Sequence, residues 1–221
     1  TTLSSTLGSS PDFLVGVINR VFFRADDGSN GVELWSSDGT AGGTAMVRNI
    51  HPTGSGEPYD LFAYNGTLLF QANDGTHGYE LWKSDGTSAG TAMIKEINAG
   101  TGEFEYSHPE YFTGFGDFVY FAADDGTHEN ELWRTDGTAA GTTLVKDINP
   151  GANPSHPFNL TAGTNRLFFV ANDGTLGYEL WQSNGTAAGT TLVRDIYPGD
   201  GYSPPEYLTD VDGMLFFSGD D

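Results

Sequence analysis

The 221-residue chain carries 30 Asp and Glu against 9 Lys and Arg, which gives a formal net charge of -21 at pH 7. This acidity argues against nucleic acid or an anionic membrane surface as a partner, since both attract basic patches, and no apolar run is long enough to span a bilayer. The chain has no cysteine, so no disulfide supports its fold. A hydrophobic content of 37% with 31 Gly and 10 Pro predicts a real core built from many short strands.

One sequence pattern occurs four times along the chain. Each copy contains an Asp-Gly turn, the tripeptide Glu-Leu-Trp, a second turn of the form Asp-Gly-Thr or Asn-Gly-Thr, and an aliphatic run that ends at an isoleucine. The copies use every tryptophan of the chain: Trp35, Trp82, Trp133 and Trp181. Their spacing of roughly 48 residues indicates one supersecondary unit that buries its apolar face against the next copy.

Each repeat is predicted to form four antiparallel strands, which we name A to D in chain order. In the first repeat, strand A is marked by Leu14, strand B by the apolar triplet 21–23, strand C by the Glu-Leu-Trp segment, and strand D by residues 45–50. Turns rich in Asn, Asp and Gly separate the strands, as tight hairpins require. Four such strands per repeat are typical of a β-propeller blade. We therefore expect an all-β propeller of about five blades, made of four full repeats and a split one.

The repeats define a single repeat domain over residues 1–221. They cover approximately 8–53, 54–100, 101–151 and 152–199, and a split, incomplete repeat combines 200–221 with 1–7. Residues 1–3 match the start of a strand D at 190–192, so the two ends could meet and close a ring that lacks one strand C. Three explanations of the gap remain: the chain continues past residue 221, it is a fragment of a longer array, or a neighbouring molecule pairs with the open strand edge. The first two are favoured.

The segment Glu-Leu-Trp-x-x-Asp-Gly-Thr-x-x-Gly-Thr is intact at 80–91 and at 131–142. It resembles the ELWxxDGT repeat family of bacterial secreted and surface proteins. The match covers nearly the whole chain and departs from the other copies at Gly42, where they have Ala before the Gly-Thr pair, and at Asn184, which replaces the Asp. The resemblance implies a secreted or cell-surface location within a larger, often adhesin-like polypeptide, and it implies little about chemistry.

The glutamate of each Glu-Leu-Trp segment is followed fifteen residues later by a basic residue. The four pairs are Glu33 and Arg48, Glu80 and Lys95, Glu131 and Lys146, and Glu179 and Arg194. Because strands C and D are hairpin neighbours, each pair could lie across the ladder or reach the adjacent blade as a partly buried salt bridge, and these residues with the tryptophans are predicted to have a structural role. A catalytic carboxylate in four identical copies is not expected. We therefore predict that the chain is not an enzyme.

An acidic residue precedes the first turn of each repeat: Asp27, Asp74, Asp125 and Asp173. Calcium needs six to eight oxygen ligands, which loops rich in Asp and Asn supply. A carboxylate in such a turn also accepts hydrogen bonds from the N–H groups of the turn itself. The sequence leaves both interpretations open, with calcium as the candidate cofactor.

Aromatic and acidic side chains occur together in or near the connections from strand D to the next strand A. The candidate ligand-binding residues are Tyr59, Tyr111, Phe158, Tyr207, Glu110 and Glu206. Aromatic faces beside carboxylates are how lectins hold sugar rings, although the same aromatic residues could serve packing between blades.

These observations predict a non-catalytic extracellular binding or structural module. Its function would be adhesion or matrix and surface assembly through repeated blade surfaces, with cell-surface or matrix glycans or proteins as partners, or other copies through the open strand edge. The alternative is a multivalent carbohydrate-binding lectin that uses the loops between blades. A glycosidase or lyase propeller is a third hypothesis, for which no unique pair of carboxylates in one cleft can be identified.

Overall fold

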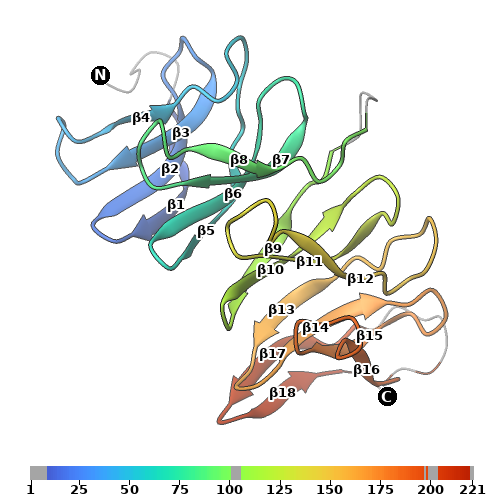
Figure 1. The fold of residues 1–221 in the computed structure, drawn as a ribbon. Helices are drawn as coiled ribbons and strands as arrows, with labels where there is room; N and C mark the ends of the chain where they lie inside the picture. The colour runs from blue at the N-terminus through green and yellow to red at the C-terminus, as the bar shows by residue number, and fades with distance from the viewer. Residues whose placement is uncertain (1–8, 101–105, 197, 199–203, 220–221) are drawn as a thin grey trace. The chain divides into compact units, whose positions relative to one another are not determined.

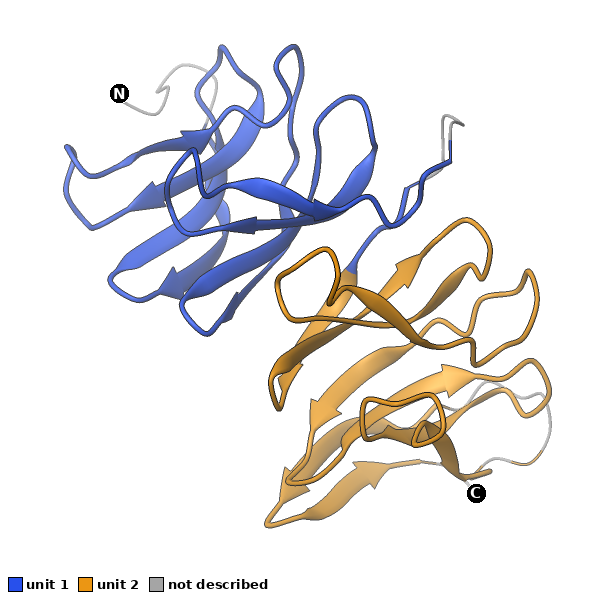
Figure 2. Cartoon of the chain, in the orientation of Figure 1, with its two compact units in different colours: residues 1–109 blue, residues 110–221 orange. Residues whose placement is uncertain are grey.

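The computed structural model describes residues 9–100, 106–196, 198 and 204–219. Within these residues the chain forms β-strands and no helix. It divides into two compact units, residues 1–109 (unit 1) and 110–221 (unit 2), which Figure 2 distinguishes by colour. Each unit is a set of antiparallel sheets in which the strands follow their order in the chain (Figure 1).

Unit 1 consists of two four-stranded sheets. The first contains β1 (Asp12–Val17), β2 (Arg20–Asp26), β3 (Val32–Ser37) and β4 (Ala45–Arg48). The second contains β5 (Tyr59–Tyr64), β6 (Thr67–Asn73), β7 (Tyr79–Ser84) and β8 (Ala92–Lys95). Each sheet is one sequence repeat, and its strands are the predicted strands A to D.

Unit 2 consists of two four-stranded sheets and a hairpin. The first sheet contains β9 (Glu110–Phe115), β10 (Phe118–Asp124), β11 (Asn130–Thr135) and β12 (Thr143–Lys146). The second contains β13 (Phe158–Ala162), β14 (Leu167–Asn172), β15 (Tyr178–Ser183) and β16 (Thr191–Arg194). The hairpin is formed by β17 (Glu206–Val211) and β18 (Met214–Ser218). The prediction that residues 1–7 contribute a strand to this last repeat lies outside the described residues.

The predicted fold class, an all-β protein built from four-stranded antiparallel propeller blades, is confirmed. The turns explain why the hairpins form where they do. Gly28, Gly75, Gly126 and Gly174 follow the turn aspartate of each repeat and have positive φ, a conformation in which a glycine has no Cβ to clash. After each of these turns strand C begins, and it places a tryptophan in the core.

The core of each unit lies between the faces of adjacent sheets. In unit 1, Phe22 and Leu34 of the first sheet pack against Leu68, Phe70 and Trp82 of the second. Successive residues of a strand point to opposite faces, so Phe23 packs with Trp35 on the other side of the first sheet. Burying each large apolar side chain stabilises the fold by roughly 1.5–3 kcal/mol.

Unit 2 repeats this arrangement. Tyr120 and Leu132 of its first sheet pack against Leu167, Phe169 and Trp181 of the second. All four tryptophans of the chain are buried. The same positions of the repeat therefore form the same contact in both units, which is what a period of one supersecondary unit requires.

Candidate functional site

Strand A of every repeat contains a β-bulge near its start. In β5, Tyr59 lies opposite Gln71 and Phe62 lies opposite Leu69, so the strand accommodates one extra residue between the two pairs. The residue that follows the first pair has a left-handed backbone in each repeat: Phe13 (φ 51), Asp60 (φ 52), Tyr111 (φ 59), Asn159 (φ 52) and Tyr207 (φ 57). This conformation is costly for an aromatic residue and persists only where the surrounding structure imposes it.

The bulge places large side chains at the surface. Phe13 is 45% exposed, Tyr111 is 50% exposed and Tyr207 is 80% exposed. In unit 2 the A strands lie side by side: the Thr113 hydroxyl donates a 3.0 Å hydrogen bond to the Leu160 carbonyl, and the Thr161 hydroxyl donates a 3.4 Å bond to the Leu208 carbonyl. Tyr111, Asn159 and Tyr207 are therefore successive members of one row of bulge residues.

A hollow of about 570 Å³ lies between β13 and β17 in this row. Its lining combines aromatic, acidic, amide and aliphatic groups: Phe158, Asn159, Leu160, Thr161, Glu206, Tyr207 and Leu208. The ring of Phe158 packs against the ring of Tyr178, and the two ring centres lie 5.7 Å apart. The hollow thus brings together three of the predicted ligand-binding residues, Phe158, Glu206 and Tyr207. The predicted Glu110 and Tyr111 occupy the same positions in β9 and do not line it.

The corresponding region of unit 1 is occupied by an arginine. The guanidinium of Arg24 lies 4.1 Å from the ring centre of Tyr59 and 5.1 Å from that of Phe13. Its Nε donates a 2.6 Å hydrogen bond to Asp12, and its Nη1 lies 3.4 Å from a carboxylate oxygen of Glu57. The hydroxyl of Tyr59 donates a 2.8 Å hydrogen bond to the same oxygen of Glu57. The predicted ligand residue Tyr59 is therefore engaged within the protein.

Arg24 was not identified from the sequence. The equivalent residues of the other strand B segments are Gln71, Ala122, Val170 and Ser218. An arginine at a position where the other repeats have a neutral residue was the sequence signal that could have identified it. The contacts with Asp12 and Phe13 could not be predicted in this way, because the bulge that brings them beside Arg24 depends on the strand register.

The glutamates of the Glu-Leu-Trp segments are buried and bind backbone N–H groups. The carboxylate of Glu33 accepts hydrogen bonds from the N–H groups of Ile50 (2.9 Å), His51 (3.1 Å) and Gly56 (3.0 Å). Glu80 and Glu131 bind the end of strand D in the same way and also accept a 2.6 Å hydrogen bond from a serine hydroxyl, that of Ser107 or Ser155. Burial raises the pKa of Glu33 and the pKa of Glu80 to about 7, although the hydrogen bonds oppose this shift.

The predicted salt bridges between Glu33 and Arg48 and between Glu131 and Lys146 are wrong. Arg48 donates a hydrogen bond to the carbonyl of Thr91 in the neighbouring sheet, and its guanidinium lies 5.8 Å from the ring centre of Trp82. Lys146 makes the same two contacts in unit 2. The physical reason is that the glutamate turns toward the buried N–H groups at the end of its own blade, while the long basic side chain crosses to the next blade.

The other two basic residues that follow a Glu-Leu-Trp glutamate by fifteen positions differ from each other in exposure. Arg194 is exposed, and Lys95 is half-buried. Glu179 accepts a 2.8 Å hydrogen bond from the N–H of Ile196, which matches the arrangement at the other three glutamates.

The aspartates considered as calcium ligands each organise their own turn. Asp27 accepts hydrogen bonds from the N–H groups of Ser29 and Asn30, both at 2.9 Å. Asp74, Asp125 and Asp173 bind the two equivalent N–H groups of their turns. Among the residues that the structure describes, no three His, Cys, Asp or Glu side chains cluster as metal ligands would.

No helix in the described part of the chain is long and apolar enough to cross a membrane. Neither protein-family models nor curated proteins match the sequence. Solved structures do match the fold. A puromycin hydrolase is similar with a TM-score of 0.51 and 17% identity over 95% of this chain, and prolyl endopeptidases are similar with a TM-score of 0.50 and 11% identity over 90%. TolB from Acinetobacter baumannii has a TM-score of 0.47 and 12% identity over 85% of this chain and 43% of its own.

The similarities to the puromycin hydrolase and the prolyl endopeptidase support the β-propeller architecture. The chain spans about a third of the puromycin hydrolase, 34% of its length, and 29% of the prolyl endopeptidase. The prediction that the chain is not an enzyme is contradicted, because the solved structures that are similar to it over most of its length include hydrolases. Repetition of a blade is a property of the scaffold, and catalytic groups can be placed on or beside a scaffold without changing it.

Proposed function

We propose that this chain is an extracellular binding module that holds carbohydrate at the strand A bulges of unit 2, and so adheres to glycan-bearing surfaces or matrix. The hollow between β13 and β17 is the observation that supports this most, since it combines aromatic faces with polar groups in one open depression. The secreted or cell-surface location belongs to the proposal and is supported by the resemblance of the repeat.

The chemistry of the hollow suits a sugar ring. The C–H face of a pyranose stacks on an aromatic ring, and Tyr207 offers such a face at the surface. Sugar hydroxyls act as donors and acceptors, for which the carboxylate of Glu206 and the amide of Asn159 are partners in the same lining. The left-handed backbone at Tyr207 holds the ring near the hollow before a ligand arrives, which limits the entropy lost on binding.

Charge restricts the class of sugar. The chain has a formal net charge of -21, and Glu206 adds a carboxylate to the hollow itself. Glycans that carry uronic or sialic acids would be repelled. We therefore propose neutral or amino-sugar glycans as ligands. The row of bulge residues continues to Tyr111 in β9, so a linear oligosaccharide could contact more than one repeat.

A glycan array followed by titration calorimetry tests this function. We expect neutral or amino-sugar oligosaccharides to bind, and the Tyr207→Ala variant to lose at least about tenfold in affinity, because aromatic stacking contributes roughly 1 kcal/mol or more beyond burial. Tyr207→Phe keeps the ring and should bind like the wild type. Phe13→Ala, at the equivalent bulge of unit 1, is a matched control that should leave affinity unchanged. Binding that persists fully in Tyr207→Ala would place the site elsewhere.

A further inference from the structure

The Arg24 cluster of unit 1 holds one cation between two neighbouring A strands. The guanidinium lies over the rings of Phe13 in β1 and Tyr59 in β5. Its Nε donates a hydrogen bond to Asp12, which lies opposite Arg24 in the β1–β2 ladder. The ring of Tyr59 packs in turn against the strand C residue Tyr79, with ring centres 6.3 Å apart. A carboxylate and two ring faces therefore form a cation site that the chain fills with its own arginine.

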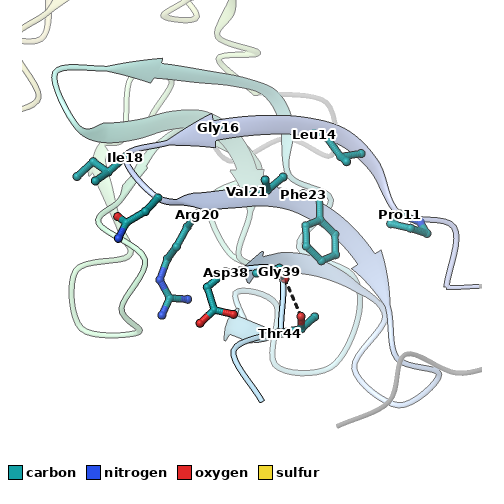
Figure 3. A pocket seen from close by; sticks show the side chains of 12 residues that line it. Pro11, Leu14, Gly16, Ile18, Arg20, Val21, Phe23, Asp38, Gly39 and Thr44 are labelled. Carbon is teal, nitrogen blue, oxygen red and sulfur yellow. Dashed lines mark hydrogen bonds between the residues drawn. The ribbon is translucent and has the colours of Figure 1, made fainter. Parts of the chain in front are cut away.

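This cation site is separate from the larger hollow on the first sheet. That hollow has a volume of about 610 Å³, and Figure 3 shows Leu14 and Val21 beside it, with Arg20 and Asp38 at one side. Neither Arg24 nor the rings and carboxylates that contact it belong to its lining. The cluster around the guanidinium is a set of contacts of its own, and its positions can be followed into the other repeats.

The same positions recur in unit 2, at the start of β9 and β13, without the arginine. These two A strands are neighbours, joined by the hydrogen bond from the Thr113 hydroxyl. Glu110 lies opposite Ala122 in the β9–β10 ladder, as Asp12 lies opposite Arg24. The carboxylate is therefore retained, whereas the arginine position is held by an alanine, which ends at its Cβ and cannot provide a cation.

Both ring positions are also retained in unit 2. Tyr111 has the left-handed bulge conformation of Phe13, and both rings are exposed. Phe158 begins β13 as Tyr59 begins β5. The ring of Phe158 packs against the strand C residue Tyr178, as the ring of Tyr59 packs against its own strand C tyrosine. Unit 2 thus repeats the carboxylate, the two rings and the supporting tyrosine of the unit 1 site.

One member of the cluster differs. Glu57, whose carboxylate lies near Arg24, is two residues before β5, and His156 is at the same position before β13. Both residues have a left-handed backbone. The negative charge at the unit 2 positions therefore comes from Glu110 alone, so an outside cation would be held less tightly than Arg24 is.

We propose that Glu110, Tyr111 and Phe158 bind an arginine side chain of a partner protein, in the place that Arg24 has in unit 1. A guanidinium suits these groups better than an ammonium, because its plane stacks on a ring while its N–H groups bind a carboxylate. The formal net charge of -21 attracts a basic partner from a distance. This site shares Phe158 with the hollow between β13 and β17, and it does not depend on glycan binding.

Titration with the capped tripeptide Gly-Arg-Gly, followed by NMR, tests the site. We expect the ring signals of Tyr111 and Phe158 to shift and to saturate. Glu110→Gln and Tyr111→Ala should each weaken binding at least about tenfold, because each removes a direct contact with the guanidinium. Glu129→Gln, which removes an exposed carboxylate of the same unit, should bind like the wild type. The capped tripeptide Gly-Lys-Gly has the same charge and should bind more weakly.

Substitutions at the arginine position give the decisive comparison. Ala122→Arg supplies the cation from within the chain, so the peptide should no longer shift the Tyr111 signals. Arg24→Ala empties the site of unit 1, so the peptide should now also shift the signals of Tyr59. Because Ala122 is fully buried, circular dichroism first checks that Ala122→Arg folds, and Arg24→Ala decides the matter if it does not.

Four results would overturn the proposal. They are unchanged peptide binding in Glu110→Gln, equal binding of the lysine peptide, no new shifts at Tyr59 in Arg24→Ala, and tighter binding of free arginine than of the peptide. The first places the site elsewhere, and the second reduces it to attraction between net charges. The third denies that the two sites are equivalent. The last shows a small-molecule ligand in place of a protein, since free arginine carries a carboxylate that the acidic chain repels.

Discussion

The Nζ of Lys146 donates a 2.9 Å hydrogen bond to the carbonyl oxygen of Thr190, which belongs to the next sheet of unit 2. The same ammonium group lies 5.5 Å from the ring centre of Trp181. One basic side chain thus joins two blades through a backbone acceptor and an aromatic face. The corresponding contacts of Arg48 with Thr91 and Trp82 join the sheets of unit 1.

Replacing Lys146 by Met should therefore destabilise the protein. We expect the free energy of unfolding to fall by about 1–3 kcal/mol, because a charge-assisted hydrogen bond and a cation–π contact are both lost. Urea unfolding followed by tryptophan fluorescence measures the change. Arg194→Met, at the exposed equivalent position, should change stability by less than about 0.5 kcal/mol. Equal effects of the two substitutions would contradict this role.

The buried glutamates predict a dependence of stability on pH. The pKa of Glu33 and of Glu80 rises from 4.5 to about 7 on folding because of burial. Between these values the folded protein binds more protons than the unfolded chain, so the free energy of unfolding decreases as pH rises from about 4.5 to 7. The pKa of His77 and of His128 is raised by a hydrogen bond with Asp74 or Asp125, which gives stability that is lost as pH rises through the raised value.

Urea unfolding at a series of pH values measures this slope. Glu80→Gln should reduce the loss of stability between mildly acidic and mildly alkaline pH, since the amide does not titrate. Glu129→Gln, at an exposed carboxylate, should leave the slope unchanged. Stability that increases with pH over this window would show that the hydrogen bonds outweigh burial.

The turn aspartates should act through their hydrogen bonds. Asp74→Ala removes the acceptor for the N–H groups of Thr76 and His77, and we expect a loss of about 1 kcal/mol in unfolding free energy. Asp74→Asn retains the carbonyl oxygen and should recover most of it. A calcium role predicts a different outcome: a chelator would lower the melting temperature of the wild type but not that of Asp74→Ala.

The Arg24 cluster should contribute to the stability of unit 1. Arg24→Ala removes the basic partner of the Asp12 and Glu57 carboxylates, of which Glu57 keeps the hydrogen bond from the Tyr59 hydroxyl, and it uncovers the rings of Phe13 and Tyr59. We expect a loss of about 1–3 kcal/mol, and Arg24→Lys should restore only part of it, since an ammonium cannot stack as a planar guanidinium does. Thermal unfolding followed by circular dichroism compares the two variants. A wild-type melting temperature in Arg24→Ala would contradict this contribution.

Local chemistry was sufficient to predict the strands and their order. Asp-Gly turns, apolar triplets and the Glu-Leu-Trp segment recur at one period, and each depends only on neighbours within the same hairpin. The sheets of unit 1 and unit 2 therefore form at the positions that the repeated sequence pattern predicts. Of the candidate ligand residues, composition alone selected Phe158, Glu206 and Tyr207, since aromatic and acidic residues cluster beside the start of strand A, and the structure places these three in the lining of one hollow.

The tertiary structure decided which side chains meet across blades. Arg48 and Lys146 bind carbonyl groups 43 and 44 residues along the chain instead of the glutamates of their own hairpins. The packing of one sheet on the next determines such partners, and a hairpin pattern carries no information about it. The strand A bulges and the Arg24 cluster likewise depend on register, because one extra residue changes which side chains share a face. The repeat itself therefore could be read from the sequence, whereas the contacts that make its copies different arise only when the sheets pack together.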